Sequence, residues 1–105
     1  MREQRIEKLR AMLEENPADI FALYAMAMEY YGLNQLEESE KYFLKVLAID
    51  QEKVAVYYQL GKLNWQKGEE KTALNYLNTG LNLLSNSQDQ KTKNEFRSLI
   101  DEIEF

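Results

Sequence analysis

The sequence predicts an all-α protein, in which six helices form antiparallel hairpins that stack as a short right-handed α–α superhelix. Apolar residues recur at three- and four-residue spacing along nearly the whole chain, and the alternation typical of strands is missing. Residues 20–53 and 54–87 also form two consecutive 34-residue units that match position by position in residue class. Since only short segments connect the predicted helices, neighbouring helices must run antiparallel.

The first helix is predicted at Arg2–Glu15, and Asn16-Pro17 ends it because a residue before proline is pushed out of the helical conformation. A second follows at about 18–33, with Asn16 or Asp19 as its cap. The others are expected at about 36–49, 52–67, 70–84 and 90–104, with Ser85-Asn86-Ser87 as the last break. On the first helix we expect Ile6, Leu9, Met12 and Leu13 to face inward, and on the second Leu23, Met26, Ala27 and Tyr30. On the third we expect Phe43, Val46, Leu47 and Ile49 to face inward, and on the last Phe96, Leu99, Ile100 and Ile103.

The corner inside each unit carries Asn34 or Gly68, the two residue types that tolerate a left-handed backbone at a helix C-terminus. Small residues recur where the two helices of a hairpin must approach closely. Ala27 and Gly61 occupy this position on the first helices, and Ser39 and Ala73 occupy it on the second helices.

These residues resemble the pattern of the tetratricopeptide repeat (TPR) family, whose 34-residue helix–turn–helix has Leu-Gly and Tyr in its first helix and Ala and Pro later. The matching residues are Tyr57, Leu60-Gly61, Gly68, Ala73, Leu77, Gly80 and Leu81 in the second unit, and Leu23, Met26-Ala27, Tyr30, Asn34, Ser39, Phe43 and Leu47 in the first. The chain departs from the pattern at Asn64, where tyrosine is usual, and at Gln51 and Ser85, where proline is usual.

The resemblance implies a single TPR-like domain over residues 1–105. Residues 1–19 would form the second helix of a preceding half-repeat, with Pro17 at the closing proline of the family. Residues 20–53 and 54–87 would be the two full repeats, and residues 88–105 a capping helix. Stacked units of this kind bury apolar faces that one hairpin cannot bury alone.

The composition argues against several classes of function. A net charge of −5 argues against nucleic-acid binding, which needs a basic surface. Cysteine and histidine are both absent, so we expect a reducing cytoplasmic location, no metal site and no cofactor. No apolar run is long enough for a membrane span. Without a phosphate-binding loop or a nucleophile–base pair, we do not expect an enzyme.

The first helix of each unit carries a second apolar stripe that hairpin packing does not explain. The stripe comprises Phe21, Tyr24, Met28 and Tyr31 in the first unit, and Ala55, Tyr58, Lys62 and Trp65 in the second. Aromatic residues and methionine are typical of interface hot spots. In the family, this concave face is a groove for an extended peptide or a partner's helix. We therefore predict that the chain binds another protein through Phe21, Tyr24, Met28, Tyr31, Tyr58, Lys62 and Trp65.

Three alternatives stay open. The terminal helices can cover the stripe, with Phe96 and Leu99 over Trp65 and the first helix over Phe21, in which case Tyr24, Tyr58 and Met28 are expected to stay most open. The chain can be a structural protein that self-associates as a homo-oligomer through exposed repeat ends. It can also be an accessory subunit of a larger complex.

Overall fold

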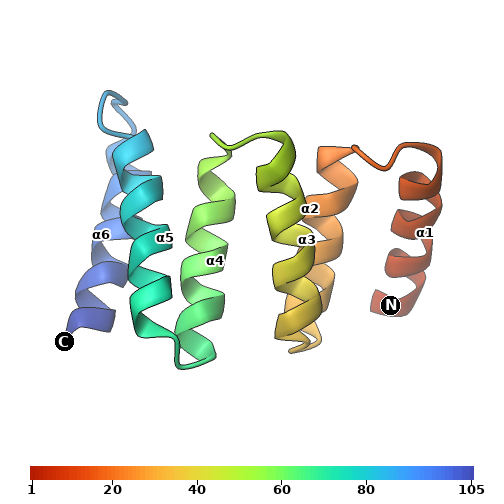
Figure 1. Ribbon diagram of the computed structural model, residues 1–105, viewed down its shortest axis with the longest axis horizontal. Helices are drawn as coiled ribbons and strands as arrows, with labels where there is room; N and C mark the ends of the chain where they lie inside the picture. Colours follow the sequence, from red (N-terminus) through yellow and green to blue (C-terminus); the bar gives the residue numbers. More distant parts are fainter. The chain divides into compact units, whose positions relative to one another are not determined.

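The computed structural model describes residues 1–105 and contains six α-helices and no strand (Figure 1). They are α1 (Arg2–Glu15), α2 (Ile20–Gly32), α3 (Leu36–Ile49), α4 (Val54–Gln66), α5 (Glu70–Leu83) and α6 (Gln90–Glu104). The predicted all-α class and number of helices are confirmed. The helix α2 begins at Ile20, two residues later than predicted, because the Asp19 carboxylate accepts a hydrogen bond from the amide of Ala22 and caps the helix.

The chain divides into two compact units, Met1–Gln51 and Glu52–Phe105. In the first unit, α2 packs against both α1 and α3. In the second unit, α5 packs against both α4 and α6, and α4 also contacts α6. The first unit therefore has one helix before its hairpin, and the second has one helix after it. The predicted single-domain organisation and its repeat boundaries stay a prediction.

The hairpin of α2 and α3 encloses the inward-facing residues that the periodicity predicted. Leu23, Met26, Ala27, Phe43 and Val46 are at most 2% exposed. The Ser39 hydroxyl donates a hydrogen bond of 2.7 Å to the carbonyl of Ala27, which joins the two helices where both side chains are small. The prediction that Ile49 faces inward is wrong, since this last residue of α3 is 46% exposed.

The hairpin of α4 and α5 also buries apolar side chains between its helices and has a small residue where they approach closely. Leu60, Leu63, Ala73 and Leu77 are fully buried, and Gly61 lies against Leu77. Asn64, which stands where the family usually has tyrosine, is also buried. Its side-chain amide donates a hydrogen bond of 2.8 Å to the carbonyl of Leu60 in the same helix, which offsets the cost of burying a polar group.

Both hairpin corners use the left-handed backbone conformation that the sequence predicted. The φ angles are 59° at Asn34 and 81° at Gly68. The residue after each corner closes the helix end, since the amide of Gln35 donates to Tyr30 and the amide of Glu69 donates to Asn64, at 3.0 and 2.8 Å. This is the hydrogen bond of a Schellman motif, and it satisfies carbonyls that the helix end would leave unpaired.

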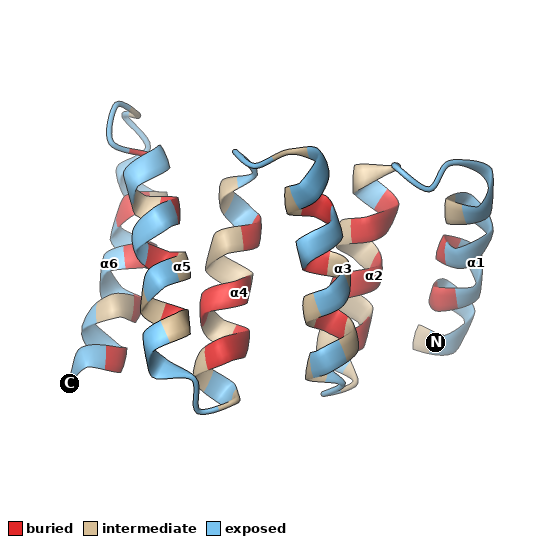
Figure 2. Cartoon of the chain, in the orientation of Figure 1, coloured by how far each residue is buried: buried red, intermediate tan, exposed pale blue.

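The first and last helices differ in how fully their apolar faces are covered. In α6, Phe96, Leu99 and Ile103 are buried against α5, as predicted. In α1, Ile6 and Leu9 are buried, but Met12 is 37% exposed, contrary to the prediction that it faces inward. Figure 2 shows the buried positions of α1 along one edge of the helix only. The physical reason is that α1 packs mainly against one helix, α2.

Candidate interaction groove between α4 and α6

The stripe on α2 is only partly open. Phe21 is 71% exposed, so the alternative in which the first helix covers it is wrong. Tyr24, Met28 and Tyr31 are partly buried. The Tyr24 ring lies edge-on to Phe43 of α3, with 5.6 Å between ring centroids. One side of Tyr24 therefore belongs to the hairpin core, and the expectation that it stays open is only partly met.

The stripe on α4 is covered in part by α6. Tyr58 lies edge-on to Phe96, with ring centroids 5.3 Å apart, and Trp65 packs against the cluster that contains Phe96 and Leu99. The alternative that Phe96 and Leu99 of the last helix cover Trp65 stays a prediction, since this cluster also contains Ala73 and Leu77 of α5. The Lys62 ammonium lies 5.9 Å from the centroid of the Tyr58 ring, which is within the range of a cation–π interaction.

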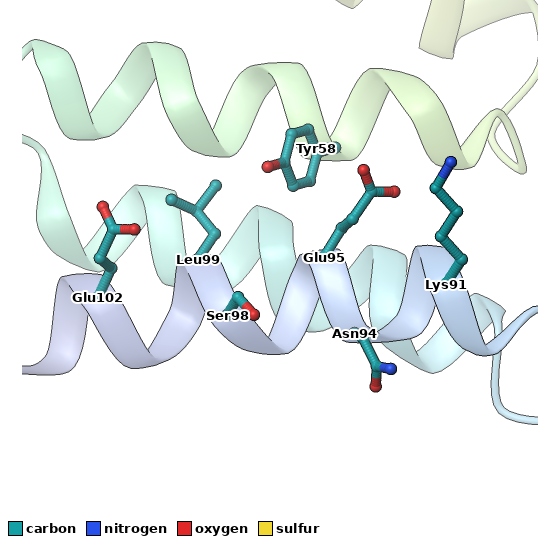
Figure 3. A pocket seen from close by; sticks show the side chains of 7 residues that line it. All are labelled: Tyr58, Lys91, Asn94, Glu95, Ser98, Leu99 and Glu102. Carbon is teal, nitrogen blue, oxygen red and sulfur yellow. The ribbon is translucent and has the colours of Figure 1, made fainter.

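A groove of about 400 Å³ runs between α4 and α6 beside Tyr58 (Figure 3). Its lining residues are Tyr58, Lys91, Asn94, Glu95, Ser98, Leu99 and Glu102. A second hollow of about 300 Å³ adjoins it and shares Tyr58 and Glu95. Tyr58 is therefore the residue of α4 that the two hollows have in common.

The groove combines the aromatic ring of Tyr58 with charged side chains of both signs, the carboxylates of Glu95 and Glu102 and the ammonium of Lys91. In Figure 3 the Tyr58 side chain extends from α4 toward α6, and Glu95, Leu99 and Glu102 extend from α6 toward α4, whereas Asn94 points away. Burial raises the pKa of the Tyr58 hydroxyl, and the negative charges of Glu95 and Glu102 raise it further. The hydroxyl therefore keeps its proton and can donate a hydrogen bond, while the carboxylates can accept hydrogen bonds or pair with a cation.

The residues that α6 contributes were missed by the sequence reasoning, which assigned this helix only a capping role. The connection before α6 spans residues 84–89, two residues longer than the connections at 16–19 and 50–53, so its register is offset from the repeat. A signal was nevertheless present. Lys91, Glu95, Ser98 and Glu102 recur at four-, three- and four-residue spacing, which places them on one face of a helix.

The groove does not have the composition of a metal centre. No group of three or more Asp, Glu, His or Cys side chains is arranged to hold a metal ion. None of the six helices combines the length and the apolar character that crossing a membrane requires. Within the groove, hydrogen bonding, ion pairing and contact with an aromatic ring are the interactions its side chains can make.

Comparisons with known proteins agree with the observed hairpins. The sequence profile of the tetratricopeptide repeat family matches residues 22–53 and 54–83. Anaphase-promoting complex subunit 3 of Dictyostelium discoideum is 33% identical over 98 residues, which is 93% of this chain and 10% of that protein. The chain thus spans about a tenth of the length of the curated relative it matches.

Solved structures have the same fold. The type III secretion translocator chaperone SycD of Yersinia enterocolitica superposes with a TM-score of 0.91 over 98% of this chain and 72% of its own, at 14% identity. SycD has also been solved in complex with a peptide of the translocator YopD, and that structure matches with a TM-score of 0.90. MamA of Desulfovibrio magneticus RS-1 is 30% identical over 84% of this chain and 49% of its own, with a TM-score of 0.76. The predicted family resemblance is confirmed.

Proposed function

The chain belongs to the tetratricopeptide repeat family, and from that membership we propose that it is a non-catalytic module that binds a peptide or helix of another protein. Proteins of this family generally serve as interaction modules and scaffolds, not as catalysts. The cytoplasmic location stays a prediction.

The observation that carries the proposal is that Tyr58 of α4 both contacts Phe96 of α6 and lines the groove between these helices. A rigid aromatic side chain loses little conformational entropy on binding, and such residues dominate the energy of many interfaces. Lys62 and Trp65 flank it on α4. On α2, we assign Tyr24, Met28 and Tyr31 to partner contacts as well.

Two relatives lend support. SycD, which has the same fold, is known in complex with a peptide of YopD. The Dictyostelium relative is, by its name, a subunit of a multiprotein complex. An accessory role in a larger complex is therefore compatible with the proposal, because such a role also depends on binding another protein.

The test blocks the groove without disturbing the core. Ser98 lines the groove and is exposed, so Ser98→Arg should fold normally and fill the space beside Tyr58. Asn82→Arg on α5 is the matched control, because Asn82 is exposed, lies outside the groove and acquires the same charge. Partners captured from the native source by the unmodified chain should be identified by mass spectrometry and then measured one by one.

We expect Ser98→Arg to weaken each specific partner by about tenfold or more and Asn82→Arg to leave it unchanged, since losing 1.4 kcal/mol at a hot spot costs a factor of ten. Circular dichroism of both variants verifies that helicity is retained. If a partner binds Ser98→Arg as tightly as the unmodified chain, the groove is not its binding site.

A further inference from the structure

The charged side chains of the groove between α4 and α6 follow a definite order along α6. Lys91 lies at one end, next to Glu95, and Glu102 lies at the other end, with Tyr58 between the two carboxylates (Figure 3). Lys62 of α4, whose ammonium is 5.9 Å from the centroid of the Tyr58 ring, does not line the groove. The stretch of the groove from Glu95 to Glu102 is therefore lined by negative charge alone.

The two carboxylates have no partner within the chain. Neither the Glu95 nor the Glu102 side chain forms an ion pair or a hydrogen bond with another residue. Lys91 is four residues from Glu95, a spacing at which helical side chains can pair, yet the two form no ion pair. Both carboxylates are thus available to a ligand in the groove.

Both carboxylates also act on the same atom of α4. Burial is the largest cause of the raised pKa of the Tyr58 hydroxyl, and the charges of Glu95 and Glu102 raise it further. The potential that the two carboxylates create at this hydroxyl is negative, which favours a cation beside it. A bound guanidinium could donate a hydrogen bond to the hydroxyl oxygen as well as to a carboxylate.

The spacing of the two carboxylates indicates the form of the ligand. Glu95 and Glu102 are seven residues apart on α6, which is two helical turns on one face and about 10.5 Å along the axis. In an extended segment of the polyproline II type, every third side chain lies on the same face, and three residues span about 9 Å. Two basic side chains three positions apart therefore match the two carboxylates, and the residues between them lie near Tyr58.

We propose that the groove binds an extended segment of the partner that carries two basic residues three positions apart, one beside Glu95 and one beside Glu102. This partner chemistry rests on the function proposed above, because it concerns the same groove. Arginine suits the site better than lysine, since its planar guanidinium binds a carboxylate through two N–H groups at once.

Three synthetic peptides provide the probes. The spaced peptide is acetyl-Ala-Arg-Ala-Leu-Arg-Ala-amide, which has its arginines three positions apart. The adjacent peptide, acetyl-Ala-Leu-Arg-Arg-Ala-Ala-amide, has the same composition and charge. The acidic peptide is the spaced peptide with glutamate in place of both arginines. Each is titrated into the complete chain labelled with ¹⁵N, and amide chemical shifts report where and how tightly it binds.

We expect the spaced peptide to shift amides of α4 and α6 and to bind about threefold more tightly than the adjacent peptide at low salt. It should bind about tenfold more tightly than the acidic peptide, and both preferences should shrink at high salt because exposed charges are screened. No shifts in α4 and α6, or equal affinity for the spaced and adjacent peptides, would overturn the proposal.

A pair of double variants tests the two carboxylates directly. Glu95→Gln/Glu102→Gln keeps the shape of both side chains and should weaken the spaced peptide by about fivefold, the loss expected for two exposed ion pairs. Asp101→Asn/Glu104→Gln is the matched control, since it removes the same charge from exposed positions of α6 outside the groove. The control should change the affinity by less than about twofold. Equal affinities for the two double variants would contradict the assignment of the basic residues to Glu95 and Glu102.

The partners captured from the native source separate this partner chemistry from the proposed function. A partner that is weakened both by Ser98→Arg and by Glu95→Gln/Glu102→Gln supports both. A partner that is weakened by Ser98→Arg but binds Glu95→Gln/Glu102→Gln as tightly as the unmodified chain leaves the groove as its binding site and overturns the basic segment.

Discussion

The side chain of Leu77 occupies the space that a Cβ on Gly61 would need, so α4 and α5 pack closer than any other residue at position 61 allows. Gly61→Ala sets two effects against each other. Alanine favours a helix by about 1 kcal/mol over glycine, whereas overpacking a core costs about 1–3 kcal/mol. We expect the clash to win and the free energy of unfolding in urea to fall by about 1 kcal/mol.

Leu77→Val is the partner variant in a double-mutant cycle, because it removes bulk from the same space. It should cost less stability in the Gly61→Ala chain than in the unmodified chain. A Gly61→Ala variant more stable than the unmodified chain would contradict the packing argument.

Gly68 tests the left-handed corner. Its φ angle is 81°, and no atom lies within 4 Å of an added Cβ, so a substitution there acts through the backbone alone. Gly68→Ala should lower the free energy of unfolding by about 1–2 kcal/mol, the cost of a left-handed conformation for a residue with a Cβ. Gly68→Asn is the matched control and should cost less, since Asn34 adopts the same conformation at the other corner. Equal melting temperatures for the two variants would contradict this explanation.

Asp89 makes the stability of the N-terminal end of α6 depend on pH. Its carboxylate accepts hydrogen bonds from the Thr92 hydroxyl at 2.7 Å and from the Thr92 amide at 3.1 Å, and these bonds lower its pKa. Because the folded-state pKa is depressed, the stabilisation is present above the ordinary pKa of 3.8 and is lost as the pH falls through the folded-state value. The melting temperature of the unmodified chain should therefore fall in acid, because this contribution to stability is lost.

Two variants separate the cap from its charge. Asp89→Ala should lower the melting temperature at neutral pH, since the cap is lost. Asp89→Asn should keep most of the capping and lose its part of the acid dependence. If Asp89→Asn and the unmodified chain lose stability equally in acid, the carboxylate is not the titrating group.

At alkaline pH, Tyr58 allows a test of what raises the pKa of its hydroxyl. Burial raises the pKa of its hydroxyl, and Glu95 and Glu102 add to this. The double variant Glu95→Gln/Glu102→Gln should move the pKa back toward 10.0 but not all the way, because burial is the larger cause. Tyrosinate absorbance measures this pKa after subtraction of the Tyr58→Phe titration. An unchanged pKa in the double variant would mean that the carboxylates lie too far from the ring to act on it.

The raised pKa of Tyr58 also determines how the stability of the fold changes with pH. Above pH 10 the unfolded chain loses the Tyr58 proton before the folded chain does, so stability falls as the pH rises through the folded-state value. This part of the alkaline loss should be absent in Tyr58→Phe, and urea unfolding at several pH values above 9 can detect the difference.

Local chemistry was predicted well because it depends on residues close together in the chain. The helical period of Leu23, Met26 and Ala27 established which face of α2 is buried, since a helix repeats its face whatever its neighbours are. Asn34 and Gly68 predicted the corners for the same reason, as few residue types adopt a positive φ angle. Family membership followed from these features at a constant spacing.

The surfaces were decided by which helices pack together, which no single stretch of sequence specifies. Tyr24 and Tyr58 are equivalent and identical, yet Tyr24 packs on Phe43 of its own hairpin and Tyr58 on Phe96 of α6. Met12 was expected to be buried and Phe21 to be open or covered by α1, and both are exposed where they line a hollow between α1 and α2. Periodicity states which face of a helix is apolar. Only the neighbours of that helix determine whether the face becomes core or a place for another molecule, because burial is a property of the packed assembly.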